Sequence, residues 1–495
     1  MIDPRFLLTD EQMRDYITHG YLVLKSGLPK SVHEQIYERT SEILEKEGNP
    51  GNNILPRVPE LQQVFADPSF RGPLASVLGP DYIMHSHRHC HVNRGPGEGG
   101  GVHRDSYWGF QRVRNHRTRW AMLMYYPQDC PEEIGPTGIV PGSQAYAEKE
   151  SWEPLESILP CVGEAGTAVL VHFDIWHRAC PNTLAKTRFM MKFQFTRMSE
   201  PTAPTWNNRS AVWPGGNGAG NRHRRMWTNL WNWHCGEPFA TGDNGSAVSE
   251  ADALAHLRGA DLETRMAAAD SLGGTGVSNK ALEALRDALR DRAEPVRLNA
   301  AYALAASGAP AVDLLVECLD DELEAARKDA AYGLCAAGLT AQSALVAACG
   351  DAAESRRGYA AFALGEMGAH VDAEAAAVVA GLAQDSSEFV RRNVADALAT
   401  MTTHSDLAVP ALTSLMQDDS GQVRFDAAYG LAHHGAAAAP ATDALVAGLH
   451  DDNRYVRNHS VEALKSIDTP QARSALFSFL ELSRWCPITN KESTF

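Results

Sequence analysis

The chain of 495 residues has few of the features that mark secreted and membrane-spanning proteins. Its nine cysteines are scattered and form no CxxC pair, which favours buried thiols in a reducing compartment over a disulfide framework. No run approaches the roughly 18–20 apolar residues that span a bilayer. The first twenty residues lack the basic start and apolar run of a signal peptide. We therefore expect a cytoplasmic protein that does not associate with membranes.

Positive charge is also scarce. The net charge is −16, and nearly all of this acidic excess lies within residues 250–485. A surface of that sign repels phosphate backbones, so nucleic-acid binding by this half is not expected. Nothing in the sequence marks an activated serine or cysteine nucleophile. The glycines of GPGEGGG (95–101) precede a predicted strand, whereas a phosphate-binding loop precedes a helix.

Residues 250–485 are rich in alanine and leucine and repeat visibly. Seven segments of the form RxxxxxxL begin 30 to 34 residues apart, at Arg265, Arg297, Arg327, Arg357, Arg391, Arg424 and Arg457. Each repeat adds a second helical segment and an acidic turn. One unit cannot bury its apolar stripe alone, so the pattern predicts an all-α solenoid of stacked units. We expect the repeated arginine to bond helix-end carbonyls or the acidic turn, which is a structural role. The pattern resembles short HEAT repeats of the kind found in bilin-lyase-like proteins.

Residues 1–200 have a different pattern. A capped amphipathic helix and a short strand are predicted within residues 7–28, and a second helix over residues 31–48. Apolar and polar residues then alternate in four strand-like runs, at 82–93, 119–127, 167–173 and 189–195. Short strands between Gly and Pro turns predict two packed β-sheets, a double-stranded β-helix of jelly-roll or cupin type, with helices outside.

The segment 201–249 carries five of the ten tryptophans, at positions 206, 213, 227, 231 and 233. A flexible linker would not hold so many aromatic residues. We interpret it as an ordered connector that packs at an interface, the favoured reading, or forms a lid. The expected organisation is a domain at 1–200, this connector, a solenoid at 250–485 and a tail at 486–495.

One group of residues carries chemistry. His103 and Asp105 are separated by one residue, so on a strand both side chains point to the same face and can reach one metal ion. His177 follows an apolar strand, and Arg188 opens the next one. Two histidines and a carboxylate on one face of an iron ion leave the other face open for a bidentate co-substrate and dioxygen. An arginine on an adjacent strand matches the distal carboxylate of 2-oxoglutarate.

These residues resemble the phytanoyl-CoA dioxygenase family of 2-oxoglutarate oxygenases. GPTGIVPGSQ is similar to its Gly…Pro-Gly-Ser-His turn with Gln144 in place of the usual histidine, and GTAVLVHFDIWHRACPN is similar to its second-histidine strand with Thr167 where aspartate is common. The resemblance implies three iron ligands, His103, Asp105 and His177, and a 2-oxoglutarate anchor, Arg188. It also places Trp120 and Asn93 beside the co-substrate, with core packing as the alternative. Halogenases typically leave the position of Asp105 vacant for chloride, so we do not expect a halogenase.

Two further groups remain open. The alternating residues His85, His87, His89 and His91 share one strand face with Asn93 and form either a second metal site or, as we favour, a polar wall of the pocket. His89, Tyr107 and Arg112 are the candidate substrate contacts. The basic run Arg112, Arg114, Arg117 and Arg119 either receives an anionic substrate or docks against the acidic solenoid.

The predicted activity is that of a dioxygenase using Fe(II), 2-oxoglutarate and O2. It hydroxylates an unactivated C–H bond of a small-molecule or carrier-bound metabolite and forms succinate and CO2. Desaturation, ring closure and epimerisation use the same ligand set. The alternatives are a protein hydroxylase whose target the solenoid recruits and a non-catalytic interaction scaffold. A bilin lyase, which the repeats alone would allow, leaves residues 1–200 unexplained.

Overall fold

The computed structural model describes residues 2–105, 114, 116–151, 158–215, 219–237 and 248–483. These residues form two compact units. The first consists mainly of residues 1–105 and 116–214, and the second mainly of residues 215–480 together with Arg114.

The first unit opens with α1 (Asp10–His19), which begins at a capping box between Thr9 and Gln12. The helix ends at Gly20, whose φ of 77° is one that only glycine adopts without strain. Four further helices lie between the first and second strands of the chain: α2 (Lys30–Lys46), α3 (Ile54–Arg57), α4 (Leu61–Ala66) and α5 (Pro68–Leu78).

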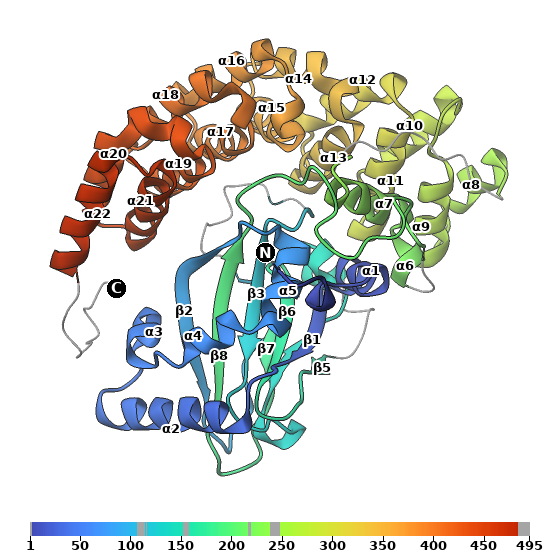
Figure 1. The fold of residues 1–495 in the computed structure, drawn as a ribbon. Helices are drawn as coiled ribbons and strands as arrows, with labels where there is room; N and C mark the ends of the chain where they lie inside the picture. Colours follow the sequence, from blue (N-terminus) through green and yellow to red (C-terminus); the bar gives the residue numbers. More distant parts are fainter. Residues whose placement is uncertain are drawn as a thin grey trace. The chain divides into compact units, whose positions relative to one another are not determined.

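Two antiparallel sheets form the body of this unit (Figure 1). The five-stranded sheet has the order β1 (Tyr21–Lys25), β6 (Thr167–His172), β3 (Trp120–Tyr125), β8 (Arg188–Thr196), β2 (Ile83–Asn93). The three-stranded sheet has the order β5 (Leu159–Pro160), β4 (Thr137–Ile139), β7 (His177–Ala179). The prediction of a double-sheet β fold with added helices is confirmed.

The interior strand β8, which lies between β3 and β2, shows how the sheet separates core from site. Its residues alternate between a polar set, which includes Arg188, Lys192 and Gln194, and an aromatic set. On the aromatic side, Phe193 packs edge-on against Phe65 of α4, with ring centroids 4.3 Å apart. Successive side chains point to opposite faces of a sheet, so the polar side chains of β8 face away from α4.

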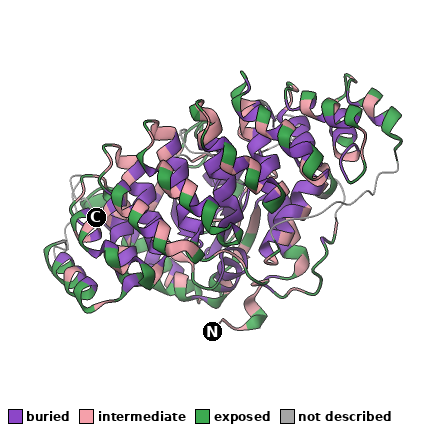
Figure 2. Cartoon of the chain, turned by 90° about the horizontal axis from the view of Figure 1, so that it is seen from above, coloured by how far each residue is buried: buried purple, intermediate pink, exposed green. Residues whose placement is uncertain are grey.

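The second unit is a solenoid of paired helices. The seven RxxxxxxL segments lie on seven separate helices: α9 (Leu262–Ser271), α11 (Glu294–Ala306), α13 (Glu324–Ala337), α15 (Glu354–Met367), α17 (Glu388–Thr400), α19 (Gly421–His433) and α21 (Arg454–Ile467). Each is followed by a partner helix: α10 (Asn279–Ala288), α12 (Ala309–Glu317), α14 (Gln342–Ala348), α16 (Ala373–Gly381), α18 (Ser405–Leu415), α20 (Thr442–Gly448) and α22 (Pro470–Ser483). The motif helices pack in sequence, and Figure 2 shows their buried faces. The predicted solenoid is confirmed.

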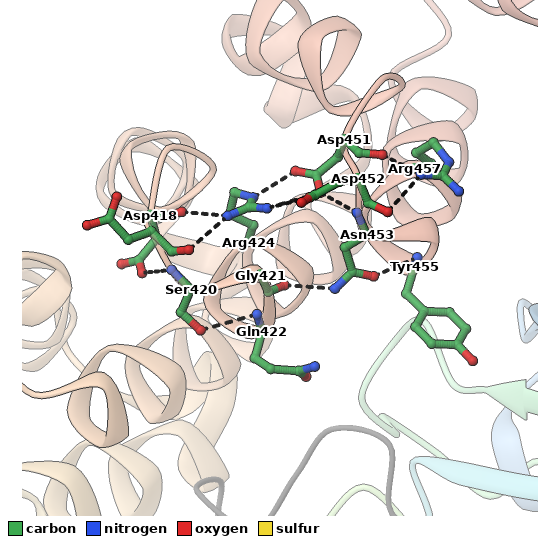
Figure 3. Close-up of polar contacts among 11 residues, drawn as sticks. Asp418, Ser420, Gly421, Gln422, Arg424, Asp451, Asp452, Asn453, Tyr455 and Arg457 are labelled. Carbon is green, nitrogen blue, oxygen red and sulfur yellow. Dashed lines mark hydrogen bonds and ion pairs between the residues drawn. The ribbon is translucent and has the colours of Figure 1, made fainter. Parts of the chain in front are cut away.

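Repeated arginines connect neighbouring repeats, as Figure 3 shows for Arg424. Arg424 donates to the main-chain carbonyl of Asp418 in its own acidic turn at 2.8 Å and to the carboxylate of Asp451 in the following turn at 2.7 Å. Arg391 repeats both bonds, to the carbonyl of Asp385 at 2.9 Å and the carboxylate of Asp418 at 2.6 Å. The structural role predicted for these arginines agrees with their contacts.

The tryptophan-rich segment is divided between the two units. Trp206 is buried in the first unit, where its indole N–H donates to Asp10 at 2.7 Å. Trp227, Trp231 and Trp233 are buried on α7 (Arg224–His234). This helix belongs to the second unit and contacts α11 of the solenoid.

One helical stretch among the described residues, Glu324–Ala348, is long and apolar enough by length and composition to cross a membrane. Its apolar character comes from alanines that let helices approach closely. It comprises α13 and α14 of the solenoid, and over half of its most apolar part is buried.

Candidate metal and co-substrate site

His103 and His177 lie opposite each other on a short antiparallel bridge, where each main-chain N–H donates to the other residue's carbonyl at 2.9 Å. This pairing brings their rings to a centroid separation of 4.5 Å. Asp105 completes the cluster, and one ligand atom from each of the three side chains lies within 4.8 Å of the others. All three side chains can therefore reach one ion.

The main chain fixes the orientation of both imidazoles. Nδ1 of His103 bonds the carbonyl of Gly101, and Nδ1 of His177 bonds the carbonyl of Ile175, both at 3.0 Å. A carbonyl only accepts, so each Nδ1 carries the proton and each Nε2 keeps a free lone pair. Both Nε2 atoms lie 3.9 Å from Oδ1 of Asp105. Burial lowers the pKa of His177 to about 4, which holds it in the neutral form that binds metals.

Asp105 has a partner that the sequence analysis did not identify. The Lys192 ammonium donates to its Oδ2 at 2.6 Å, and both side chains are largely buried. Burial raises the pKa of Asp105, but Lys192 and the nearby histidines outweigh that effect and bring it to about 2. The carboxylate is therefore ionised at neutral pH. Lys192 lies four residues after Arg188 on one strand. This even spacing places both side chains on the same face of the sheet, and it is the sequence signal that could have identified Lys192.

Arg188 is 1% exposed. Its Nε donates to the carbonyl of Gly135 at 2.9 Å, and Nη1 lies 3.5 Å from the carbonyl of His91. Among the residues that the structure describes, no carboxylate pairs with it. Burying a charge without a counter-charge is costly, so this environment fits an anionic ligand.

Register places three further polar residues on the same sheet face. Asn93, His91 and His89 of β2 stand opposite Arg188, Met190 and Lys192 of β8, and directly paired residues share a face. The amide of Asn93 donates to the carbonyls of Gly135 and Cys180, both at 3.0 Å. Nε2 of His91 is buried with no hydrogen-bond partner in the described part of the chain.

The other histidines of β2 differ in their surroundings. His85 packs edge-on against Trp120, with ring centroids 5.1 Å apart, and His89 lies beside His91 at 5.0 Å. Trp120 is buried at the start of β3. Within the described residues, His103, Asp105 and His177 are the single cluster with metal-binding spacing. The role of the β2 histidines as a polar wall of the pocket stays a prediction.

Two of the candidate substrate contacts, Tyr107 and Arg112, lie outside the described residues. In the rest of the basic run, the Arg119 guanidinium pairs with Glu200 at 2.8 Å. The carbonyl of Arg114 accepts a hydrogen bond from the hydroxyl of Tyr332, which belongs to the same unit.

Residues 16–190 match the model of the phytanoyl-CoA dioxygenase (PhyH) family. This part of the chain is a PhyH domain. The matched segment contains the metal-binding cluster and Arg188. Residues 251–335, 343–432 and 409–485 match the HEAT repeat model, so the solenoid is a HEAT array.

Several solved structures are similar to part of the chain at low identity. They include the non-heme monooxygenase ThoJ with nickel (15% identity, TM-score 0.32, covering 40% of this chain and 83% of that chain). The α-ketoglutarate-dependent carbocyclase SnoK from nogalamycin biosynthesis is 21% identical (TM-score 0.33, 39% and 85% covered). EctD from S. alaskensis is 16% identical (TM-score 0.34, 42% and 87% covered). No curated protein matches the chain.

Gln144, which replaces the usual histidine of the family's turn, has a structural role in this PhyH domain. Its amide donates to the carbonyls of Ile17 and Thr18 at the end of α1, at 3.0 and 3.3 Å. A side chain at Gly20 would approach Gln144 to within 2.4 Å. Gln144 therefore satisfies main-chain carbonyls at the end of α1, and its replacement of the usual histidine leaves the cluster of His103, Asp105 and His177 intact.

Proposed function

We propose that the protein is a non-haem Fe(II)- and 2-oxoglutarate-dependent dioxygenase. The observation that carries this proposal is the buried guanidinium of Arg188, which pairs with no carboxylate among the described residues and lies on the same sheet face as Lys192, the partner of the cluster residue Asp105. Arg188 and Lys192 are four residues apart, so their Cα atoms lie about 13 Å apart along the strand, and the long side chains of both residues extend from the same face. A dicarboxylate with one end at the metal and the other at the guanidinium would supply the counter-charge that Arg188 needs.

In this proposal His103, Asp105 and His177 hold the iron, and Arg188 binds the distal carboxylate of 2-oxoglutarate. Iron with 2-oxoglutarate and O2 supplies an oxidant strong enough to break an unactivated C–H bond, with succinate and CO2 as co-products. Nε2 of His91, which has no hydrogen-bond partner among the described residues, offers a further hydrogen bond on the same face. Asn93 acts indirectly, because its amide already bonds the Gly135 carbonyl that also accepts from Arg188.

The proposed substrate is a small-molecule or carrier-bound metabolite that is hydroxylated. The HEAT array favours one alternative, a protein substrate held by the solenoid, because HEAT repeats commonly serve as interaction platforms. Both proposals require the same iron site.

Succinate release tests the activity before the substrate is known, because these oxygenases turn over 2-oxoglutarate slowly without substrate. Wild-type protein with Fe(II), 2-oxoglutarate and air should form succinate. His177→Ala should lower the rate of succinate formation to that of Fe(II) without protein, because the substitution removes a buried ligand. Equal rates for the two folded proteins would refute the proposal.

A further inference from the structure

Lys192 occupies a rigid position beside the cluster. It lies in the middle of β8, with its Cα opposite His89 of β2 and Met124 of β3, so neighbouring strands fix it on both sides. Its side chain is 5% exposed, and its ammonium donates to Oδ2 of Asp105 at 2.6 Å. A long side chain held this way presents its ammonium at a fixed point.

The two oxygens of Asp105 therefore have different surroundings. Oδ1 faces Nε2 of His103 and Nε2 of His177 at 3.9 Å each, whereas Oδ2 is taken by the Lys192 ammonium. We propose that Lys192 is a positioning residue that restricts Asp105 to one metal-binding oxygen and thereby keeps a coordination position open. The inference rests on the proposed function, since it assumes that iron binds to this cluster.

The open position matters for the reaction. Three protein ligands on one face of a six-coordinate iron leave three positions, of which 2-oxoglutarate takes two and dioxygen needs the third. A carboxylate that bound through both oxygens would fill that third position. Residues behind the ligands commonly tune a metal site in this way, and their loss typically changes metal affinity or activity about 10- to 100-fold.

A simpler role for Lys192 would be charge balance for a buried carboxylate. Both roles need a positive charge at position 192. Restricting Asp105 to one metal-binding oxygen also needs a hydrogen-bond donor directed at its Oδ2 atom. Lys192→Met removes both the charge and the donor, so the two roles are separated by the readout: lost charge balance would change Fe(II) binding and chelate formation, whereas lost control of the binding mode would weaken nitric oxide binding to a chelate that still forms. Lys192→Arg keeps both charge and donor. Gln194→Met is a matched control, because it places the same apolar side chain two residues further along the same face of β8, away from Asp105.

Nitric oxide is a suitable probe, because it binds ferrous iron at the position that dioxygen would take and gives an electron paramagnetic resonance signal. Full-length proteins are loaded anaerobically with Fe(II) and 2-oxoglutarate, the visible band of the chelate is recorded, and nitric oxide is titrated. We expect Lys192→Met to form the chelate but to bind nitric oxide at least about tenfold more weakly than wild type. Gln194→Met should match wild type, and Lys192→Arg should recover most of the affinity.

The outcomes are distinct. Wild-type affinity for nitric oxide in Lys192→Met would overturn the positioning role, and so would a folded Lys192→Arg protein as defective as Lys192→Met. Absence of the chelate band from wild type would instead refute the proposed function, whatever the variants do.

Discussion

At the scale of single residues, the site is defined by groups that are buried without their usual partners. The Arg188 guanidinium has no carboxylate in the described part of the chain, and Nε2 of His91 has no hydrogen-bond partner there. Burial lowers the pKa of His91 to about 2, with Lys192, His89 and Arg188 adding to the effect. An uncharged imidazole between two cations suits a pocket that receives an anion.

This depressed pKa makes the metal-free domain sensitive to acid. The folded pKa of His91 lies below that of an unfolded histidine, about 6.5, so the unfolded state binds more protons below pH 6.5 and stability falls as pH decreases. His177, with a folded pKa of about 4, acts in the same direction. Each of the two histidines should lower the free energy of unfolding by about 2 kcal/mol between pH 7 and pH 5.

Urea unfolding of metal-free wild type and His91→Asn at pH 7 and pH 5 measures this effect. The variant should lose less stability on acidification than wild type, because asparagine does not titrate. The same pH dependence in both proteins would show that His91 is not held neutral in the fold.

The residues of the candidate metal site could be found from the sequence because their spacing reports strand geometry. His103 and Asp105 are two residues apart, and His177 and Arg188 adjoin clear apolar strands. Lys192 was missed because a lysine within a strand ordinarily indicates a solvent-facing position. Its burial depends on the pairing of β8 with β2 and β3, which no local pattern reveals.

At the scale of elements, the sequence predicted those helices and strands that have a clear apolar periodicity or a repeated motif. The long strand β2 spans Ile83–Asn93 against a prediction of 82–93, and the seven motif copies each lie on a helix of their own. The short strands β4, β5 and β7 were not located individually. They have two or three residues each, too few for an alternating pattern, and they form through contacts with distant segments.

Close approach of neighbouring helices stabilises the solenoid, and glycine substitutions test this. A Cβ at Gly365 of α15 would lie 2.5 Å from the Cα of Ala397 in α17, so Gly365→Ala must push two motif helices apart. Gly381 in α16 has no atom within 4 Å of such a Cβ. Thermal unfolding should show Gly365→Ala destabilised by about 1–3 kcal/mol and Gly381→Ala unchanged or slightly stabilised. Equal effects would contradict the packing described for α15 and α17.

At the scale of the whole molecule, the chain joins a PhyH domain to a HEAT array, and most of its acidic excess lies in the array. The PhyH domain contains the complete set of proposed iron ligands and Arg188. The array contributes buried ion pairs such as Arg392–Asp426, at 2.9 Å, which lie within the array itself. Substrate chemistry and solenoid function are therefore separable questions.

Removal of residues 250–495 tests whether the solenoid is needed for activity. A small-molecule oxygenase should keep 2-oxoglutarate-dependent succinate release if the shortened protein still forms the Fe(II)–2-oxoglutarate chelate. The measurement is the succinate rate relative to full-length protein, with the chelate band as the control for an intact site. A shortened protein that forms the chelate but has lost basal turnover would contradict a self-sufficient PhyH domain.

The most direct test of the account is an anaerobic titration of metal-free protein with Fe(II) and then 2-oxoglutarate, followed by the weak visible charge-transfer band of the chelate. Wild type should develop the band, and His103→Ala should not. Arg188→Met should need at least about a hundredfold more 2-oxoglutarate, because a charge-assisted bidentate contact is lost. Lys186→Met removes an exposed positive charge two residues away and should behave as wild type. A well-folded wild-type protein without the band would contradict the assignment of an iron and 2-oxoglutarate site.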